Sequence, residues 1–409
     1  MSDRLKLFRR LMSAFEGTSD PQRAVERGFY INMPNNPIEE ITGRVALRPS
    51  SVHLLFGGIG SGKTTQLLLT KKALNELEDI KAIYVDVSLV TDISDLQSGA
   101  LITIAALELI KTLSNTNSTQ INKHKQTIEK AAYGYSEKKI VTKSLIPAYE
   151  AIKFLTNHEQ EETIIHKGLL SSEKQENREL VLDAFSQLNK AAKEITKKYT
   201  VFLFDSLDRL RNSQIFINSA LDDVIDINNI GIGSVLIGSI ATMYEERERI
   251  AEISGYNYFL PYCNVSENHE VRQFFKDILT VRDTGDFITL DARELLIFQS
   301  GGVLRDLISL CQATIEESYI DGSDQITEQH VNQAILAIRR SKLIGLTDAS
   351  INVLRKVMTE KSFSPRTSED FELLLTGHIL EYRHPRQRFV VHPVLAPLIE
   401  SIGASVAYG

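Results

Sequence analysis

Cysteine is scarce in this sequence, with two residues, Cys263 and Cys311, in a chain of 409. Two thiols cannot build a disulfide framework, and no cluster of cysteine and histidine has the spacing of a zinc site. We therefore expect both cysteines to be buried thiols in a chain that folds in a reducing compartment.

Long hydrophobic runs are also missing. The longest candidate, residues 230–243, contains glycine and serine and falls short of the roughly 18 apolar residues that span a bilayer. Residues 1–10 include basic side chains, but no apolar stretch follows them, which excludes a signal peptide. We expect a soluble, cytoplasmic protein that does not bind membranes.

The chain has no basic surplus, since 46 Lys and Arg stand against 53 Asp and Glu for a net charge of −7. This excludes a generally basic protein that coats nucleic acid, although it allows a local basic patch. Hydrophobic residues make up 43% and charged residues 24% of the chain. That balance is typical of globular proteins, and the length suggests about two to three domains.

A glycine-rich motif follows an apolar segment, 52–56, that is typical of a buried strand. The motif consists of Gly57, Gly58, Ile59, Gly60, Ser61, Gly62, Lys63 and Thr64, and Thr65 opens a helical stretch, 65–77. It matches the P-loop pattern in the strand–loop–helix context that the pattern requires. Glycines let backbone N–H groups turn toward an anion, and the following helix adds the positive end of its dipole. We expect Lys63 to reach the β- and γ-phosphates of a nucleotide and Thr64 to ligate Mg²⁺.

A P-loop needs an acid that holds the metal, and Asp205 follows the apolar segment 201–204. Asp86, near the end of the strand expected at 81–87, is either a second polar group in that crevice or a solvated strand-end acid. The residue after Asp205 is Ser206, where many ATPases place an acid that polarises the attacking water. The nearest substitute is Asp208, which either takes that role or packs against Arg209. Without a substitute we expect slow hydrolysis.

Strands that alternate with helices predict an α/β fold with a parallel sheet covered on both faces. Helical spacing then dominates at 291–298, 303–315 and 327–338, and a helix at 349–359 precedes two short β segments, 379–383 and 388–392, in the pattern of a winged helix. We divide the chain into an N-terminal helical and extended segment at 1–45, a nucleotide-binding domain at 46–255 with a largely helical, polar insertion at 112–200, a helical lid at 256–340 and a winged-helix domain at 341–409.

Together these motifs resemble the AAA+ ATPases, especially their origin-recognition-like and STAND/KAP-like branches. Residues 57–64 look like Walker A, and 201–205 look like Walker B, with 205–209 similar to its acid-rich form. Residues 300–307 are similar to the lid segment that carries the sensor-2 arginine, and 326–335 to the helix that closes the lid. The resemblance implies a P-loop NTPase fold with a helical lid, ATP and Mg²⁺ as cofactors, and ATP hydrolysis. The insertion lies outside it.

The resemblance also implies roles for single residues. Sensor 1, a polar residue after the next strand, is Ser239 or Thr242. Arg305 would reach the γ-phosphate from the lid, unless it is a surface arginine of its helix. Arg247 or Arg249 would serve the site of a neighbouring subunit, unless their charge run is a solvated helix face.

Three functions remain open. The first is an ATP-dependent oligomeric switch that assembles as a ring or filament and regulates a partner protein. The second is a DNA-binding initiator or transposition-type loader, in which Arg383, Arg386 and Arg388 of the wing contact duplex phosphates. Against it, residues 341–409 hold eight Lys and Arg and seven Asp and Glu, a weak surplus for a duplex binder. The third is a nucleotide-gated scaffold with slow hydrolysis, for instance in a bacterial defence system.

Overall fold

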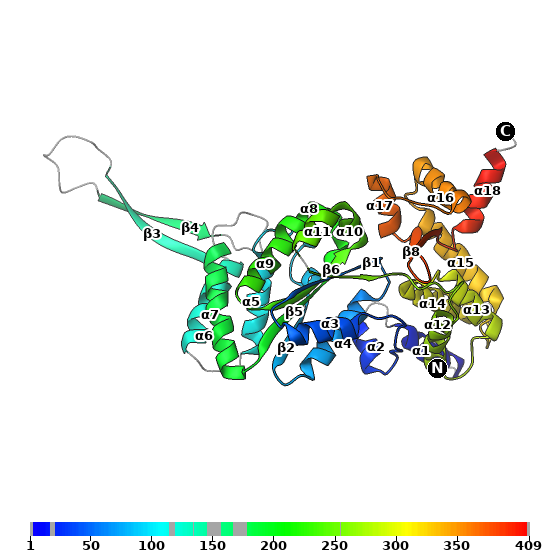
Figure 1. Ribbon diagram of the computed structural model, residues 1–409, viewed down its shortest axis with the longest axis horizontal. Coiled ribbons are helices and arrows are strands. Elements are labelled where there is room, and N and C mark those ends of the chain that lie inside the picture. Colours follow the sequence, from blue (N-terminus) through cyan, green and yellow to red (C-terminus); the bar gives the residue numbers. More distant parts are fainter. Residues whose placement is uncertain are drawn as a thin grey trace.

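The computed structural model describes residues 3–16, 21–113, 119–133, 135–144, 157–166, 178–253 and 255–406. At its centre lies a five-stranded sheet with the order β2-β5-β6-β1-β7, and all its neighbouring strands are parallel (Figure 1). The strands are β1 (Val52–Gly57), β2 (Ile80–Asp86), β5 (Tyr199–Asp205), β6 (Gly233–Ser239) and β7 (Tyr256–Leu260). The first three confirm the predicted strands to within two residues. The fifth lies past the predicted domain boundary at 255, so that the sheet domain extends further along the chain than expected.

Each face of the sheet carries its own hydrophobic core. In β5, Phe202 and Phe204 contribute to one core, whereas Val201 and Leu203 contribute to the other. All four side chains are fully buried. A parallel strand buried on both faces has a continuous apolar sequence rather than an alternating one, and this is why the strand was evident from its composition.

Helices cover both faces. The helices of the first core are α5 (Ala100–Thr112), α6 (Thr119–Tyr133), α7 (Arg178–Thr196), α9 (Asp222–Asn229) and α11 (Arg247–Ile253). The second core takes in α1 (Asp3–Phe15), α3 (Ile38–Leu47), α4 (Lys63–Asn75) and the lid. The shorter helical elements are α2 (Pro21–Glu26), α8 (Ser213–Ile215), α10 (Ile240–Glu245), a π-helical turn at Phe216–Leu221 and 3₁₀ turns at Val87–Leu89, Ile93–Asp95 and Leu207–Arg209.

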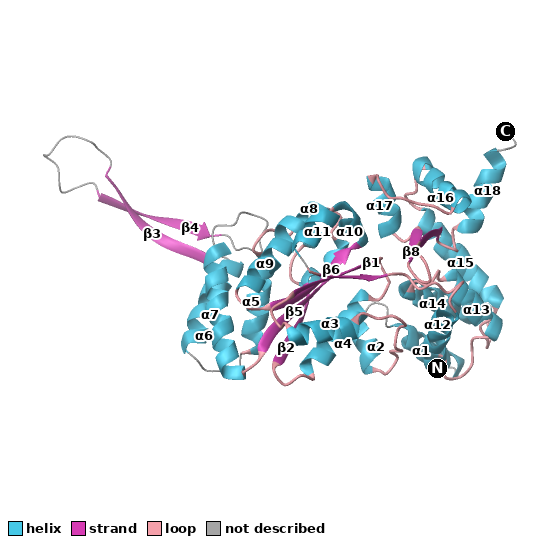
Figure 2. Ribbon diagram, in the orientation of Figure 1, coloured by secondary structure: helices cyan, strands magenta, loops and turns pink. Residues whose placement is uncertain are grey.

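The prediction of a largely helical insertion at 112–200 needs two corrections. Its last helix, α7, belongs to the sheet domain, because Phe185 packs edge-on against Phe202 in the first core. The insertion also contains an antiparallel hairpin of two ten-residue strands, β3 (Tyr135–Ser144) and β4 (Asn157–His166), which the polar composition concealed. Figure 2 shows this hairpin projecting away from the body of the molecule, at the end opposite the lid and the C-terminal domain.

The helical lid follows the sheet, as predicted. Its helices are α12 (His269–Arg282), α13 (Leu290–Gln299), α14 (Leu304–Asp321) and α15 (Glu328–Leu343). The N-terminal segment is packed against the lid, since the Arg4 guanidinium donates to the Ser318 and Ser323 carbonyls. The chain therefore runs from the lid surface toward the P-loop before it enters the sheet.

The C-terminal domain has the predicted winged-helix pattern. It consists of α16 (Asp348–Glu360), α17 (Ser368–Leu375), β8 (Ile379–Tyr382), β9 (Arg388–Val391) and α18 (Ala396–Val406). The two short strands form the antiparallel wing. The Thr347 side chain caps α16 by accepting the Ser350 N–H.

Two further expectations concern the whole chain. Both cysteines are buried and unpaired, as expected. None of the helices that the structure describes combines the length and the apolar character needed to cross a bilayer.

Candidate nucleotide-binding site

The P-loop lies between β1 and α4, with Gly60 and Gly62 in the left-handed region at φ 85° and 102°. Gly62 precedes α4 without a side-chain cap, so the first N–H groups of the helix remain available to an anion. Gly60 is also needed for close approach, because a Cβ there would lie 2.9 Å from side-chain atoms of Val303 and Arg305. The lid therefore packs directly on the phosphate-binding loop.

Lys63 is buried and folded back over the loop. Its ammonium donates to the Gly57 and Gly58 carbonyls at 2.9 and 2.8 Å. It also forms an ion pair with Asp208, with 2.8 Å between Nζ and Oδ2. Asp208 lies in the 3₁₀ turn that follows β5. The structure thus brings together the P-loop lysine and the acid suggested as a water-activating group, but as partners of each other.

Asp205 ends β5, and its carboxylate accepts hydrogen bonds from the Ser206 N–H at 2.6 Å and the Tyr84 hydroxyl at 2.7 Å. Burial raises the pKa of the Asp205 carboxyl, and these hydrogen bonds oppose the rise. The Thr64 side chain lies near enough to Asp205 to lower the pKa of this carboxyl as well, so the two predicted metal ligands lie close together. Their hard oxygen donors fit Mg²⁺, which keeps several waters and needs few protein ligands.

Tyr84 was not predicted from the sequence. It lies on β2, the neighbour of β5, and burial beside Asp205 raises the pKa of its hydroxyl. The sequence feature that could have pointed to Tyr84 is its position two residues before Asp86, the acid at the end of the β2 strand. That acid, Asp86, accepts the Ser88 N–H and hydroxyl and caps the following turn, which is a structural role.

Ser239 and Thr242 form one hydrogen-bonded group. Ser239 ends β6 in register with Gly57 and caps α10 by accepting the Thr242 N–H at 3.0 Å. The hydroxyl of Thr242 lies 2.9 Å from that of Ser239 and accepts a hydrogen bond from Ser213. Ser239 is thus the member of the pair that lies at the sheet edge beside the P-loop, and Thr242 holds the Ser239 hydroxyl through hydrogen bonds.

The lid places Arg305 over the P-loop. Gly301 and Gly302 have φ 60° and 72° and start the turn that leads into α14. The Arg305 N–H approaches the Gly60 carbonyl at 3.4 Å, whereas its side chain is exposed. The structure thus combines a P-loop after β1, an acid at the end of the β5 strand, a helical lid with its arginine on the loop and a C-terminal winged-helix pattern.

This arrangement agrees with the P-loop NTPase sheet and helical lid that the sequence resemblance to the AAA+ ATPases implies. By sequence, the chain matches no family model and no curated protein. Among solved structures it is similar to the Aeropyrum pernix ORC2 protein, with 14% identity, 92% of this chain and 98% of that chain covered, and a TM-score of 0.46. It is also similar to the Aeropyrum pernix ORC1 protein in complex with DNA, with 13% identity, 91% of this chain and 94% of that chain covered, and a TM-score of 0.44. A third similar structure is the Thermotoga maritima RuvB Holliday junction branch migration motor, with 14% identity, 90% of this chain and 95% of that chain covered, and a TM-score of 0.40.

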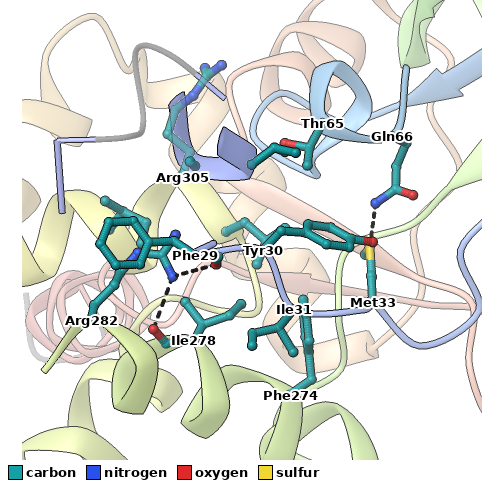
Figure 3. Close-up of a pocket in the computed structure, with 14 residues that line it drawn as sticks. Phe29, Tyr30, Ile31, Met33, Thr65, Gln66, Phe274, Ile278, Arg282 and Arg305 are labelled. Carbon is teal, nitrogen blue, oxygen red and sulfur yellow. Dashed lines mark hydrogen bonds between the residues drawn. The ribbon is translucent and has the colours of Figure 1, made fainter. Parts of the chain in front are cut away.

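A pocket of about 130 Å³ opens beside the P-loop (Figure 3). It lies between the N-terminal segment, α4 and the lid. Its walls are mainly apolar and aromatic, and its polar groups include Thr65, Gln66 and Arg305. The residues labelled in Figure 3 are Phe29, Tyr30, Ile31, Met33, Thr65, Gln66, Phe274, Ile278, Arg282 and Arg305. The pocket has the character of a small-ligand site, with apolar walls and a few polar groups.

The remaining predicted site residues lie elsewhere. Arg247 and Arg249 are exposed at the start of α11, so neither belongs to the site of its own chain. Two of the three wing arginines are engaged within the chain. Arg383 pairs with Glu381 at 2.8 Å, and Arg388 pairs with Glu267 at 2.8 Å. Arg386 is exposed in the turn between the strands.

Proposed function

We propose that this chain binds ATP with Mg²⁺ and hydrolyses it slowly, as an oligomeric switch that acts on a partner protein. The observation that carries the proposal is the position of the buried P-loop Lys63 against Asp208, next to Asp205 at the end of β5 and under a lid that holds Arg305 on the loop. These groups come from three separate stretches of the chain and converge at one sheet edge. The aromatic pocket next to Thr65 would take the base.

Each polar group has a distinct task in this proposal. Thr64 and Asp205 would hold Mg²⁺, which neutralises charge on the β- and γ-phosphate oxygens. Lys63 would exchange its bonds to the Gly57 and Gly58 carbonyls for bonds to the phosphates. Ser239 would contact the γ-phosphate or the attacking water from β6, and Arg305 would contact the γ-phosphate from the lid.

Slow hydrolysis follows from the position of Asp208. An acid that forms an ion pair with Lys63 is held away from water activation until that pair is broken. The adjacent position, Ser206, supplies no carboxylate; its backbone N–H donates to Asp205. This observation favours the scaffold alternative, in which nucleotide binding rather than turnover sets the state of the protein.

The engaged wing arginines favour a protein partner over duplex DNA. Arg388 donates to Asn264 and Ser266 as well as to Glu267, and the Arg383 guanidinium stacks 3.6 Å from the Phe259 ring centroid. A wing that reads phosphates needs its cations free. Of the three, Arg386 has its side chain at the exposed turn.

The test measures ATP binding and turnover with and without Mg²⁺ and with and without duplex DNA. We expect Mg²⁺-dependent binding, slow turnover that DNA does not stimulate, and loss of turnover in Asp205→Ala. Asp208→Ala should lose as much turnover or less. Normal turnover in Asp208→Ala would remove this residue as the base and favour the scaffold. Strong stimulation by duplex DNA would favour the loader, and absence of nucleotide binding would overturn the proposal.

A further inference from the structure

A second hollow lies on the other side of Phe29 from the nucleotide pocket. Its volume is about 300 Å³, at the lower end of the range for small-ligand sites. Phe29 and Arg282 line both hollows and so form the wall between them. Figure 3 shows how this wall is held, with the Arg282 guanidinium donating to the Phe29 and Ile278 carbonyls at 3.1 Å.

Three arginines from three elements line this second hollow. Arg10 comes from α1, Arg27 follows α2, and Arg282 ends α12. No Asp or Glu is among the described residues that line it. In a chain with a net charge of −7, three cations around one hollow without an acid form a local excess of positive charge.

The two acids that closely follow Arg282 in the sequence are engaged within the lid. Asp283 accepts the N–H groups of Phe287 and Ile288 and pairs with Arg293 at 2.9 Å. Asp286 pairs with the same arginine at 2.8 Å. Both carboxylates therefore stabilise the turn between α12 and α13, and neither forms an ion pair with the arginines of the hollow.

The donors of these arginines are only partly used. Arg27 donates from one nitrogen, Nη1, to the carbonyl and hydroxyl of Ser13. Arg282 is half-buried, and burial lowers the pKa of its guanidinium to about 10 because no carboxylate offsets the desolvation. A desolvated cation without a counter-charge gains more from an anion than a solvated one does.

We propose that this hollow binds a small phosphate compound with two or more negative charges. The guanidinium fork matches phosphate oxygens in pairs, and three forks from three directions suit a tetrahedral, multiply charged group better than a single carboxylate. Leu11, Phe29 and Phe287 form the apolar part of the lining and would pack against the body of an organic phosphate.

The test must separate this site from the P-loop, which also binds phosphates. Inorganic phosphate and pyrophosphate are titrated by calorimetry, at constant ionic strength, into the protein saturated with ADP and Mg²⁺ and into the Lys63→Ala variant. One binding event should persist in both. The Lys63→Ala arm tests the second site even where ADP binding, and with it the proposed nucleotide function, fails.

The double variant Arg10→Ala/Arg27→Ala should weaken this event at least tenfold. Both side chains are exposed, so the fold should tolerate their loss. The matched control is Arg211→Ala/Lys356→Ala, which removes two exposed charges outside the hollow. The proposal is overturned if no event remains once the P-loop is occupied or disabled, or if both double variants bind alike. Binding of inorganic phosphate as tight as that of pyrophosphate would assign the site to a single phosphate group.

Discussion

Lys63 divides its donors between two P-loop carbonyls and the Asp208 carboxylate, and it is almost fully buried. A buried ammonium of this kind is placed before the nucleotide arrives, and binding requires an exchange of partners rather than a new side-chain conformation. The same exchange releases Asp208. In the proposed function, nucleotide binding and access to a water-activating acid would therefore be coupled through this one ion pair.

We expect Lys63→Ala to weaken ATP binding about tenfold to a hundredfold, since a charge-assisted contact to phosphate is worth roughly 1.5–3 kcal/mol. Fluorescence titration with a labelled ATP measures this. Lys72→Ala, an exposed lysine on the same helix, is the control. Equal affinity in Lys63→Ala and the wild type would remove residues 57–64 as the nucleotide site.

Tyr84 holds Asp205 from the neighbouring strand, and this contact makes a second prediction at the residue scale. Tyr84→Phe keeps the ring but removes the hydrogen bond that lowers the pKa of the Asp205 carboxyl. We expect the Mg²⁺ concentration for half-maximal ATP turnover to rise about two- to tenfold, the equivalent of roughly 0.5–1.5 kcal/mol. Tyr199→Phe, at the opposite end of β5, should leave it unchanged. An unaltered Mg²⁺ requirement in Tyr84→Phe would contradict a positioning role.

The wing contacts two parts of the molecule that are far from it in the sequence, the helix α10 and a residue bonded to the P-loop. Glu381 of β8 is fully buried and accepts hydrogen bonds from Arg383, Gln387 and the Tyr244 hydroxyl of α10. Its backbone carbonyl accepts the N–H of Tyr262, whose hydroxyl donates to the Ile59 carbonyl of the P-loop. One strand of the wing thus touches both the helix that Ser239 caps and a residue bonded to the P-loop.

We expect Glu381→Gln to destabilise the docked wing by about 1–3 kcal/mol, because it leaves the Arg383 guanidinium without its counter-charge. Denaturant unfolding measures the loss, and trypsin should cut faster after Arg386 in the exposed turn. Glu372→Gln, a half-exposed acid of α17, serves as the control. Equal cleavage in the two variants would show that Glu381 does not hold the wing.

The whole molecule is elongated, with the lid and winged helix at one end and the β3–β4 hairpin at the other (Figure 1). Arg247 and Arg249 are exposed at the start of α11 and are free to reach another subunit. A head-to-tail contact that completes a site closes into a ring or continues as a filament. Transfer of a γ-phosphate needs a cation from outside the P-loop, and a neighbour can supply it.

We expect ATP with Mg²⁺ to shift the protein to a larger assembly, measured by mass photometry. The double variant Arg247→Ala/Arg249→Ala should lose turnover but keep nucleotide binding, whereas Arg305→Ala should impair the site of its own subunit. Mixing Lys63→Ala subunits with the Arg247/Arg249 double variant should restore part of the activity, since each supplies what the other lacks. No restoration together with an unchanged mass distribution would make the protein a monomeric switch.

The sequence by itself determined the elements with short-range signals. The P-loop has its glycines and lysine within eight residues, the buried strands are continuous apolar runs, and the lid and wing have clear periodicity or turns. The fold class and the winged-helix pattern therefore agree with prediction. The strand β7 and the hairpin β3–β4 were missed because short or polar strands carry little local signal.

Only the tertiary structure decided which side chains meet. The pairing of Lys63 with Asp208, the support of Asp205 by Tyr84 and the capture of Arg383 and Arg388 join residues between 2 and 145 positions apart in the chain. Such contacts depend on strand order, on how the lid rests on Gly60 and on how the wing docks. Packing of the folded chain sets these arrangements, and no local pattern in the sequence encodes them.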